Sequence, residues 1–401
     1  MQFGYLKPPA LTLEEKENWL NDINVNLHVR MQLDEFERTP EPFRNYTIDS
    51  GRITFRVEGE FEVDLTIGDE DFSKQFWFID FRVLYKPTPP IAENARQFIE
   101  GRVNEALATD GLRGCYKYLH EFILTLKIQE FARQAIELNS TKWVDTLFVE
   151  RLQRCLSIQY WRDCPHSRGV KSWVILGVNN GKNGDEDSDI DAPSYISLRW
   201  FRDGKEVKDA VIDFDVDTIS TDALLTTLTS KHIEHLLSSI YNRLLSKPRF
   251  ARSQANLALN ISAREPADSS LTMQLLGKDS ASLQINPFSG RFTLNPRTLG
   301  LGDAERRLNS LANPAEEGSA ALEQIRCYYT MRQLNTRGKC LNWNVLRSPI
   351  SSEDLKSIVY SGGRSREAYQ AIWMKHARWN PELFVMMSLS LGGDQWWLVE
   401  L

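Results

Sequence analysis

The chain has 401 residues, of which 42% are hydrophobic and 25% are charged, and its formal net charge is −6. This composition is typical of a globular protein with roughly two or three structural units, and the acidic balance argues against general attraction to nucleic acid or anionic lipid. No apolar run approaches the roughly 20 residues that cross a bilayer. The cysteines are odd in number and scattered, which favours reduced thiols over disulfides or zinc ligands: Cys115, Cys155, Cys164, Cys327 and Cys340.

Residues 1–45 are predicted to form an N-terminal helix and a linker. Apolar residues recur at helical spacing within residues 11–31, and the sequence TPEP at 39–42 stops the pattern. The residues that carry this spacing are Leu13, Trp19, Leu20, Ile23 and Leu27.

Residues 46–165 are predicted to be a first block of sheet and helices, opening with an alternation of apolar and charged residues from 53 to 67. Alternation indicates strands with one dry face, and one strand of this length would span roughly 50 Å, which is too long. We therefore predict a hairpin. A three-residue loop of Glu58, Gly59 and Glu60 pairs Val57 with Phe61 and keeps both on the dry face.

The strand that follows breaks the alternation, because Phe76, Trp77, Phe78 and Ile79 are apolar on both faces. Three amphipathic helices are predicted after it, over residues 91–107 starting at Pro90 and stopped by Gly111, over 112–138 and over 143–160. Helices can cover only one side of this sheet. The simpler cover for the other side is another part of this chain, and the alternative is a partner.

The next two blocks repeat the order of strands followed by helices. In residues 166–250, strands at 171–178, 194–201 and 210–216 precede a helix at 224–245, opened by Ser220, Thr221 and Asp222. In residues 251–340, strands at 255–261, 271–276, 281–285 and 290–296 precede helices at 303–311 and 315–334. The sequence therefore predicts an α+β fold, an elongated array of successive antiparallel sheet and helix blocks.

Residues 341–401 are predicted to begin a further helix and to end in a hairpin. Its strands are 383–391 and 396–401, and its turn is Gly392, Gly393 and Asp394. The chain stops inside the second strand without a polar tail, so we expect the natural protein to continue beyond Leu401.

Several segments imitate chemical motifs without completing them. Residues 177–183 are one residue short of a phosphate loop and have Asn183 where Ser or Thr should bind magnesium. The acidic residues from Asp185 to Asp191 copy the start of a calcium loop, but Ile190 and Ile196 replace its glycine and closing glutamate. We interpret this segment as a solvated loop.

Histidine and cysteine offer no better site. His232 and His235 lie three apart on a predicted helix with no third ligand nearby, so we interpret them as surface or half-packed residues. Nothing in the sequence lowers the pKa of Cys164, which is interpreted as an inert thiol. Because the motifs GxSxG, HExxH, paired CxxC and GxGxxG are absent, we predict no enzyme activity, no metal and no cofactor.

Several longer segments together resemble subunit 14 of the Mediator complex in its fungal form. They run from residue 4 to residue 401 and include GRITFRVEGEFEVDLTI (51–67), QFWFIDFRVLYKP (75–87), VERLQRCLSIQYW (149–161), KSWVILGV (171–178) and GDQWWLVEL (393–401). Members of this family are much longer, and the chain resembles their first repeat module.

The resemblance implies a non-enzymatic scaffold in the nucleus that docks the head and middle modules of Mediator and links toward the tail. It implies that contact with RNA polymerase II is indirect, and it implies no specific nucleic acid and no membrane. The alternative function is an adaptor that binds transcription activators directly. The LxxLL receptor motif of some animal members is not found in the sequence.

Aromatic residues are enriched both in protein cores and at interface hot spots, and two regions of the chain carry more aromatic area than one face needs. Their candidate partner-interface residues are Phe76, Phe78, Trp373, Trp379 and Trp396. A place in the core is the alternative for each of them.

Overall fold

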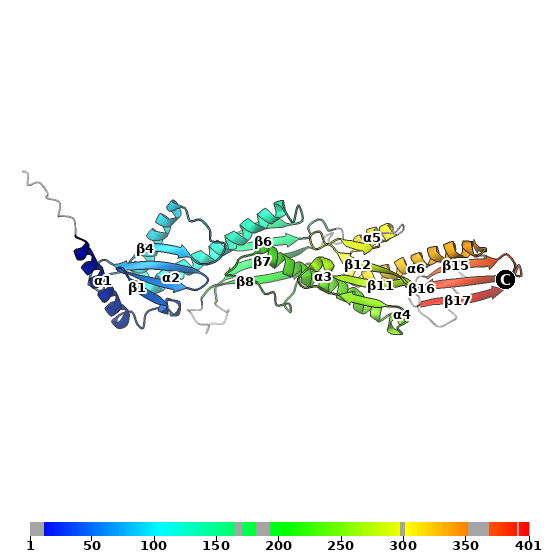
Figure 1. Ribbon diagram of the computed structural model, residues 1–401, viewed down its shortest axis with the longest axis horizontal. Helices are drawn as coiled ribbons and strands as arrows, with labels where there is room; N and C mark the ends of the chain where they lie inside the picture. The colour runs from blue at the N-terminus through cyan, green and yellow to red at the C-terminus, as the bar shows by residue number, and fades with distance from the viewer. Residues whose placement is uncertain are drawn as a thin grey trace, which may run out of the picture.

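The computed structural model describes residues 12–164, 171–181, 193–296, 301–351, 369–390 and 393–400. Four antiparallel sheets follow one another along an elongated molecule, with helices beside and between them (Figure 1). The predicted α+β array is confirmed.

The first sheet has the order β1-β2-β3-β4, with α1 (Leu13–Leu33) packed on it. A 3-10 helix (Glu41–Arg44) leads into β1 (Tyr46–Asp49), β2 (Arg52–Val57), β3 (Phe61–Ile67) and β4 (Phe76–Val83). Val57 pairs with Phe61, so the predicted three-residue loop is confirmed. Its central residue, Gly59, has φ of 71°, which favours glycine.

Helix α2 (Glu93–Ser140) begins after Ala92, so its predicted start at Pro90 is wrong. The helix is broken where predicted, because Asp110 and Gly111 have non-helical backbone angles. The predicted helix over 143–160 is also wrong, since β5 (Phe148–Leu152) and β6 (Cys155–Tyr160) form a hairpin there. Leu156, Ile158 and Tyr160 are buried at alternate positions, a strand pattern that the helical spacing of the same segment concealed.

The second sheet has the order β5-β6-β7-β8-β9 and includes β7 (Ser172–Asn179), β8 (Tyr195–Arg202) and β9 (Lys205–Glu206). The predicted strand at 210–216 is wrong. Its residues alternate between exposed and half-buried but pair with no strand of the described chain. The alternation therefore reflects an extended segment that packs on the protein without hydrogen-bonding to a neighbouring strand. Helix α3 (Thr221–Leu245) is capped by Ser220, whose side chain accepts from the Ala223 N–H.

The third sheet has the order β10-β11-β12-β13. After α4 (Pro248–Ala251), its strands are β10 (Leu257–Asn260), β11 (Ser270–Leu276), β12 (Asp279–Ile285) and β13 (Phe292–Asn295), with a 3-10 turn at Pro266–Asp268. Helices α5 (Leu301–Asn309) and α6 (Pro314–Cys340) follow, as predicted.

The fourth sheet contains β14 (Trp343–Leu346), β15 (Tyr369–His376), β16 (Leu383–Ser390) and β17 (Gly393–Glu400) in that order. The predicted terminal hairpin is confirmed by the pairing of β16 with β17. Strands β14 and β15 were not predicted, and the described residues of 341–401 contain no helix. Residues 352–368 lie outside the described part.

Each long helix is shared by two neighbouring sheets. Helix α2 contacts β4 and then β5, β6 and β7; α3 contacts β10 and β11 and bonds to β6 through His232; α6 contacts β11 and then β14 and β15. Among the described residues, one hydrophobic core runs through the first three sheets, from Leu27 to Ile325. The predicted blocks therefore share helices. They also share a sheet, because β6 of the first block pairs with β7 of the second.

Candidate partner interfaces

Two of the five candidate interface residues belong to the core. Phe76 is 2% exposed and lies under the guanidinium of Arg30, 3.9 Å from the ring centre. Trp373 is 1% exposed and clusters with Met386. Neither side chain offers surface to a partner in this structure, which favours the alternative of a core place for both, and an anchor role for them stays a prediction. Phe78 is half-buried against the main core.

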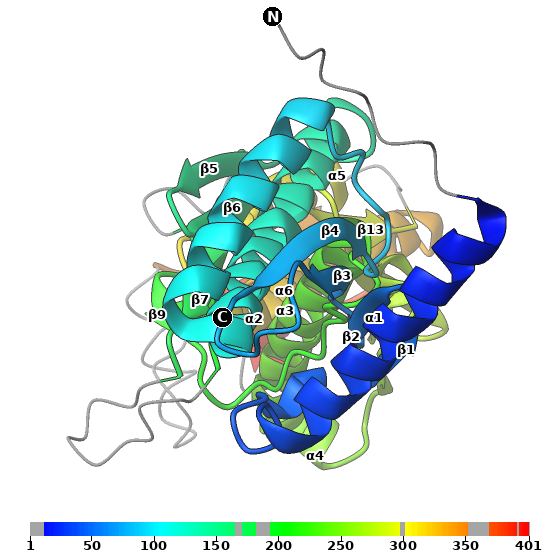
Figure 2. The same ribbon diagram turned by 90° about the vertical axis from the view of Figure 1, so that its left-hand side faces the viewer.

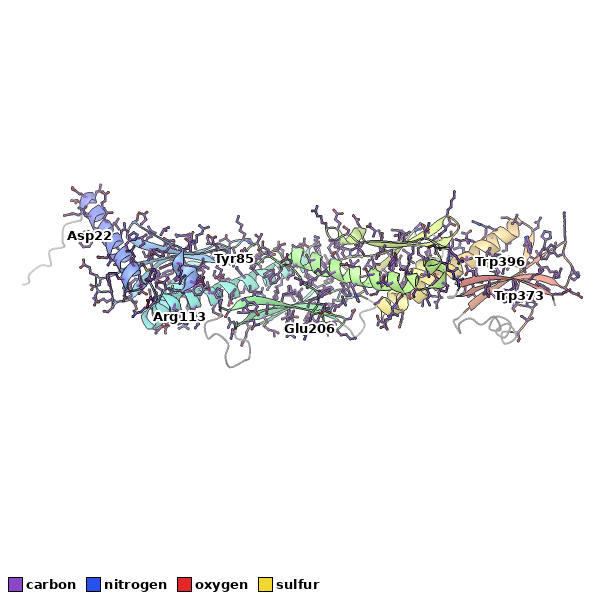
Figure 3. All side chains as sticks on the ribbon, turned by 90° about the horizontal axis from the view of Figure 1, so that it is seen from below. Asp22, Tyr85, Arg113, Glu206, Trp373 and Trp396 are labelled. Carbon is purple, nitrogen blue, oxygen red and sulfur yellow. The ribbon has the colours of Figure 1, made fainter. Side chains whose placement is uncertain are left out.

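Of the other two candidates, Trp379 lies in the turn between β15 and β16, and Trp396 lies on β17, at the end of the molecule opposite α1 (Figure 3). Trp379 is partly exposed and packs edge-on against Trp343. Trp396 is 57% exposed on β17, and Leu398 is exposed on the same face. Trp396 and Leu398 form what we term the C-terminal apolar face. Its role in partner binding stays a prediction.

The C-terminal apolar face exists because α6 covers only part of the sheet. Met387 and Val385 pair with Trp396 and Leu398 and lie on the side that packs against α6. Helix α6, however, contacts β14 and β15. The strand farthest from the helix therefore keeps its apolar residues exposed.

A buried ion cluster holds β17 in this position. The fully buried Arg326 of α6 donates to Glu323 at 3.1 Å and to both carboxylate oxygens of Asp394 at 2.9 and 2.7 Å. Burial lowers the pKa of Arg326, but the charges of Glu323, Cys327 and Asp394 outweigh it and raise the pKa overall. Asp394 lies at the start of β17, so the cluster ties the strand to the helix.

The described residues leave part of the second face of the apolar run of strand β4 uncovered. Leu65 pairs with Phe78 and Asp64 with Asp80, so Ile79 is an extra residue in a β-bulge. Trp77 and Ile79 are both exposed. Both alternatives for covering these two side chains, another part of this chain or a partner, therefore stay predictions.

Helix α1 carries an apolar surface that the sequence analysis missed. Its buried side, with Leu27, Arg30 and Met31, packs toward the sheet. A second set of apolar residues is exposed, at spacings of four, four and three; these residues, which we term the N-terminal apolar stripe, are Val25, Val29, Leu33 and Phe36. Their spacing of three and four residues is the signal in the sequence that marks this second stripe.

The motif-like residues form no metal site in the described part of the chain, where no group of three His, Cys, Asp or Glu residues could hold an ion. His232 is 2% exposed, bonds to the Tyr160 hydroxyl at 3.1 Å and stacks on Trp161, so its interpretation as a surface or half-packed residue is wrong. His235 is half-buried, and Cys164 is buried. Residues 182–192, which include the acidic residues of the calcium-like loop, lie outside the described part, and Ile196, at the position of the closing glutamate, lies in β8.

An open cleft of about 830 Å³ lies between the hairpin of β8 and β9, helix α3 and the start of α6. Its lining mixes charges of both signs: Arg202, Lys205, Lys208 and Arg243 with Asp203, Glu206, Asp209 and Glu316. Arg199 donates to Glu206 at 2.7 Å.

None of the described helices is long and apolar enough to cross a membrane.

Two family models match the chain. The model described as Mediator complex subunit MED14 matches residues 1–69, which include α1 and the first three strands. The model described as Fungal Med14 domain matches residues 240–334, which include the third sheet and much of α6.

Curated relatives extend the similarity over nearly the whole chain. Three of them, from three fungi, are named Mediator of RNA polymerase II transcription subunit 14. That of Chaetomium globosum is 53% identical over 403 residues, covering 99% of this chain and 34% of the relative. That of Neurospora crassa is 51% identical over 409 residues, covering 100% and 32%. That of Pyricularia oryzae is 41% identical over 403 residues, covering 99% and 36%. The chain spans about a third of the length of these relatives, and it belongs to the Mediator subunit 14 family in its fungal form.

Proposed function

We propose that the chain is a non-enzymatic scaffold of the Mediator transcription coactivator and acts in the nucleus on transcription by RNA polymerase II. In this role it docks subunits of the head and middle modules and links toward the tail. The names of its relatives, which are subunits of Mediator of RNA polymerase II transcription, support the membership. The proposal assigns the chain no catalytic step and no cofactor.

The observation that carries the scaffold role is the contrast between buried joints and exposed ends. The sheets are joined by shared helices around a continuous core, whereas apolar residues stay exposed on α1 at one end and on β17 at the other. Exposed apolar groups with polar surroundings mark protein interfaces, and the interfaces of permanent assemblies are large and apolar. An elongated body with an apolar surface at each end is suited to holding two partners apart.

Reconstitution with purified head and middle modules tests this proposal. The chain is expected to co-elute with at least one module, and the double variant Trp396→Ala/Leu398→Ala or the triple variant Val25→Ala/Val29→Ala/Leu33→Ala should reduce that binding. Val211→Ala is a matched control, because Val211 is exposed but lies away from both ends. A chain that folds and binds neither module would contradict the proposal.

The cleft favours the adaptor function as a second candidate, because an open, charged groove at a joint can take a short peptide segment. Purified transcription activators would then bind the isolated chain. Lys208→Glu should weaken that binding, whereas the exposed and distant Lys16→Glu should not. Binding of an activator that is insensitive to Lys208→Glu would remove the cleft from consideration.

A further inference from the structure

The N-terminal apolar stripe lies on a helix that is apolar on two sides. One side of α1 packs against the first sheet through Leu27 and Met31, and Figure 2 shows the helix at the flank of the molecule with its other side turned outward. Leu33 is 76% exposed at the end of that outward side. A helix with two apolar faces is usually covered twice, and no other described element covers the second face.

The shape of the stripe indicates what can cover it. Val25, Val29 and Leu33 are four residues apart, so their side chains form one narrow ridge along the helix. Every backbone group inside α1 is engaged by the helix itself, which excludes the strand pairing that would capture an extended peptide. A narrow ridge of β-branched and leucine side chains packs best into the groove of a second helix.

The charges on α1 and on the turn after it indicate the sign of the charges that the partner helix should carry. The exposed charged residues of α1 and the turn after it are mostly acidic: Glu14, Glu15, Glu17, Asp22 and Glu37 stand against Lys16 and Arg38. Arg30 is buried in an ion pair with Glu35 at 3.4 Å, and Arg38 pairs with Asp34. Asp22 lies near the outer end of the molecule (Figure 3), one turn before Val25. A second copy of the chain would bring the same acidic rim against itself, which disfavours self-association.

We infer that the N-terminal apolar stripe binds an amphipathic helix of another protein, with an apolar seam flanked by lysine or arginine. This inference rests on the proposed scaffold function, because it names the chemistry of the partner at one end of the scaffold. The apolar seam supplies the affinity, and the basic flanks select the partner and its orientation.

Site-specific photo-cross-linking in a complex assembled from the full chain and purified Mediator subunits tests the inference. Benzoylphenylalanine replaces Val29, and a control chain carries it at Glu17, which lies on α1 away from the stripe. The expected product from position 29 joins α1 to a basic helical segment of a partner subunit, and position 17 should give little of it. Cross-links to residues 1–11 of this chain, to a second copy or to an acidic or non-helical segment would each overturn the inference, as would the absence of cross-links in an assembled complex.

Two synthetic peptides provide a test that does not need Mediator. Both carry leucine at the seam of a helix, with lysine flanks in one and glutamate flanks in the other. The lysine peptide should bind the chain at low salt about tenfold more tightly than the glutamate peptide. Leu33→Ala should weaken its binding about tenfold, and Asp22→Lys/Glu37→Lys should weaken it about fivefold. Lys16→Glu, which adds acidic charge, serves as the control.

The two experiments separate the two proposals. A chain that binds Mediator subunits, but shows neither peptide preference nor cross-links from position 29, keeps the scaffold function and loses the inference. A chain that prefers the lysine peptide through α1 but binds no Mediator subunit keeps the docking chemistry and loses the scaffold function. Circular dichroism of each variant checks that α1 is intact.

Discussion

His120 is a buried residue whose two ring nitrogens both face acceptors. Its Nδ1 lies 2.8 Å from a carboxylate oxygen of Glu60, and its Nε2 lies 2.7 Å from the carbonyl oxygen of Ser194. Since a carboxylate and a carbonyl can only accept, both nitrogens must donate, and the ring is an imidazolium. The residue thereby joins the loop between β2 and β3 to the segment before β8 through α2.

The stability of the joint should depend on pH because of His120. Burial and nearby Lys127 lower the pKa of His120. The hydrogen bond and the negative charge of Glu60, together with the hydrogen bond to the Ser194 carbonyl, outweigh them and raise the pKa above its ordinary value of 6.5. A raised folded pKa means that the stabilising contribution is fully present below the unfolded pKa and is lost as pH rises through the folded pKa. We expect the difference in free energy of unfolding between the chain and His120→Gln to shrink above that pKa.

Urea unfolding at a series of pH values measures that difference, and the NMR titration of the His120 ring gives the folded pKa directly. Tyr116→Phe leaves the ion pair in place and serves as the control. A His120 that titrates at or below 6.5 in the folded chain would contradict the imidazolium assignment.

Two aromatic residues with opposite burial should respond differently to truncation. Phe76→Ala removes a fully packed ring beside Arg30 and should lower the free energy of unfolding by about 3 to 5 kcal/mol. Trp396→Ala removes an exposed ring and should change it by less than about 1 kcal/mol. Denaturant unfolding of the two variants measures both changes. Equal losses of unfolding free energy would mean that Trp396 is packed in solution.

At the scale of elements, the break in α2 depends on one glycine. Gly111 has φ of 58° and ψ of −142°, a region that only glycine enters readily. A Cβ at this position would meet no atom within 4 Å. A side chain would therefore destabilise the protein only through backbone strain, and not through a clash. The break kinks the helix, and the half after it still packs on the first sheet, where Phe122 contacts Phe81 of β4.

Gly111→Ala should therefore destabilise the chain by about 1 to 3 kcal/mol. The matched control is Gly101→Ala in the same helix, where a Cβ also meets no atom within 4 Å and alanine should stabilise by up to about 1 kcal/mol. Thermal denaturation of both variants measures the contrast. A neutral Gly111→Ala would indicate that α2 can run straight without loss of packing.

Elements with strong local constraints could be predicted from the sequence. Segments whose apolar residues fit the spacing of both a helix and a strand could not. The loop between β2 and β3 was predictable because only an odd loop keeps Val57 and Phe61 on one face. Residues 143–160 match the spacing of a helix and of a strand, and pairing with β7 decided between them. In the same way, neighbours such as Phe76 and Trp77 look alike in sequence. Only the position of each side chain relative to α1 and the bulge at Ile79 separates core from surface.

At the scale of the whole molecule, the fourth sheet is less firmly integrated than the other three. The main core ends at Ile325, while β14 to β17 pack in two small separate clusters. The buried Arg326, with Glu323 and Asp394, is a polar tie between this sheet and α6. Local opening is expected where apolar contacts are few, so this sheet should open first.

Hydrogen exchange can test this order of opening. Amides of β15 and β16 should exchange faster than those of β3, β7 and β11. Arg326→Met should accelerate exchange in β16 and β17 specifically, because Glu323 and Asp394 would lose their partner, a change that typically costs about 3 to 5 kcal/mol. Restored protection in Arg326→Met/Glu323→Gln/Asp394→Asn would identify the unpaired charges as the cause. Uniform protection of all four sheets would contradict the expected order.

The sharing of each long helix between two sheets also determines where the chain can be divided for biochemical work. A cut at a loop between a sheet and its following helix leaves that sheet with a bare apolar side and deprives the next sheet of support. Soluble fragments should therefore end after a complete shared helix, for example near Ser140 or Leu245, and should overlap by that helix rather than abut. Two such overlapping fragments would each carry a copy of the shared helix. In each fragment its own copy would already occupy the surface that the other fragment's copy would have to bind, so the fragments should not reassemble when mixed.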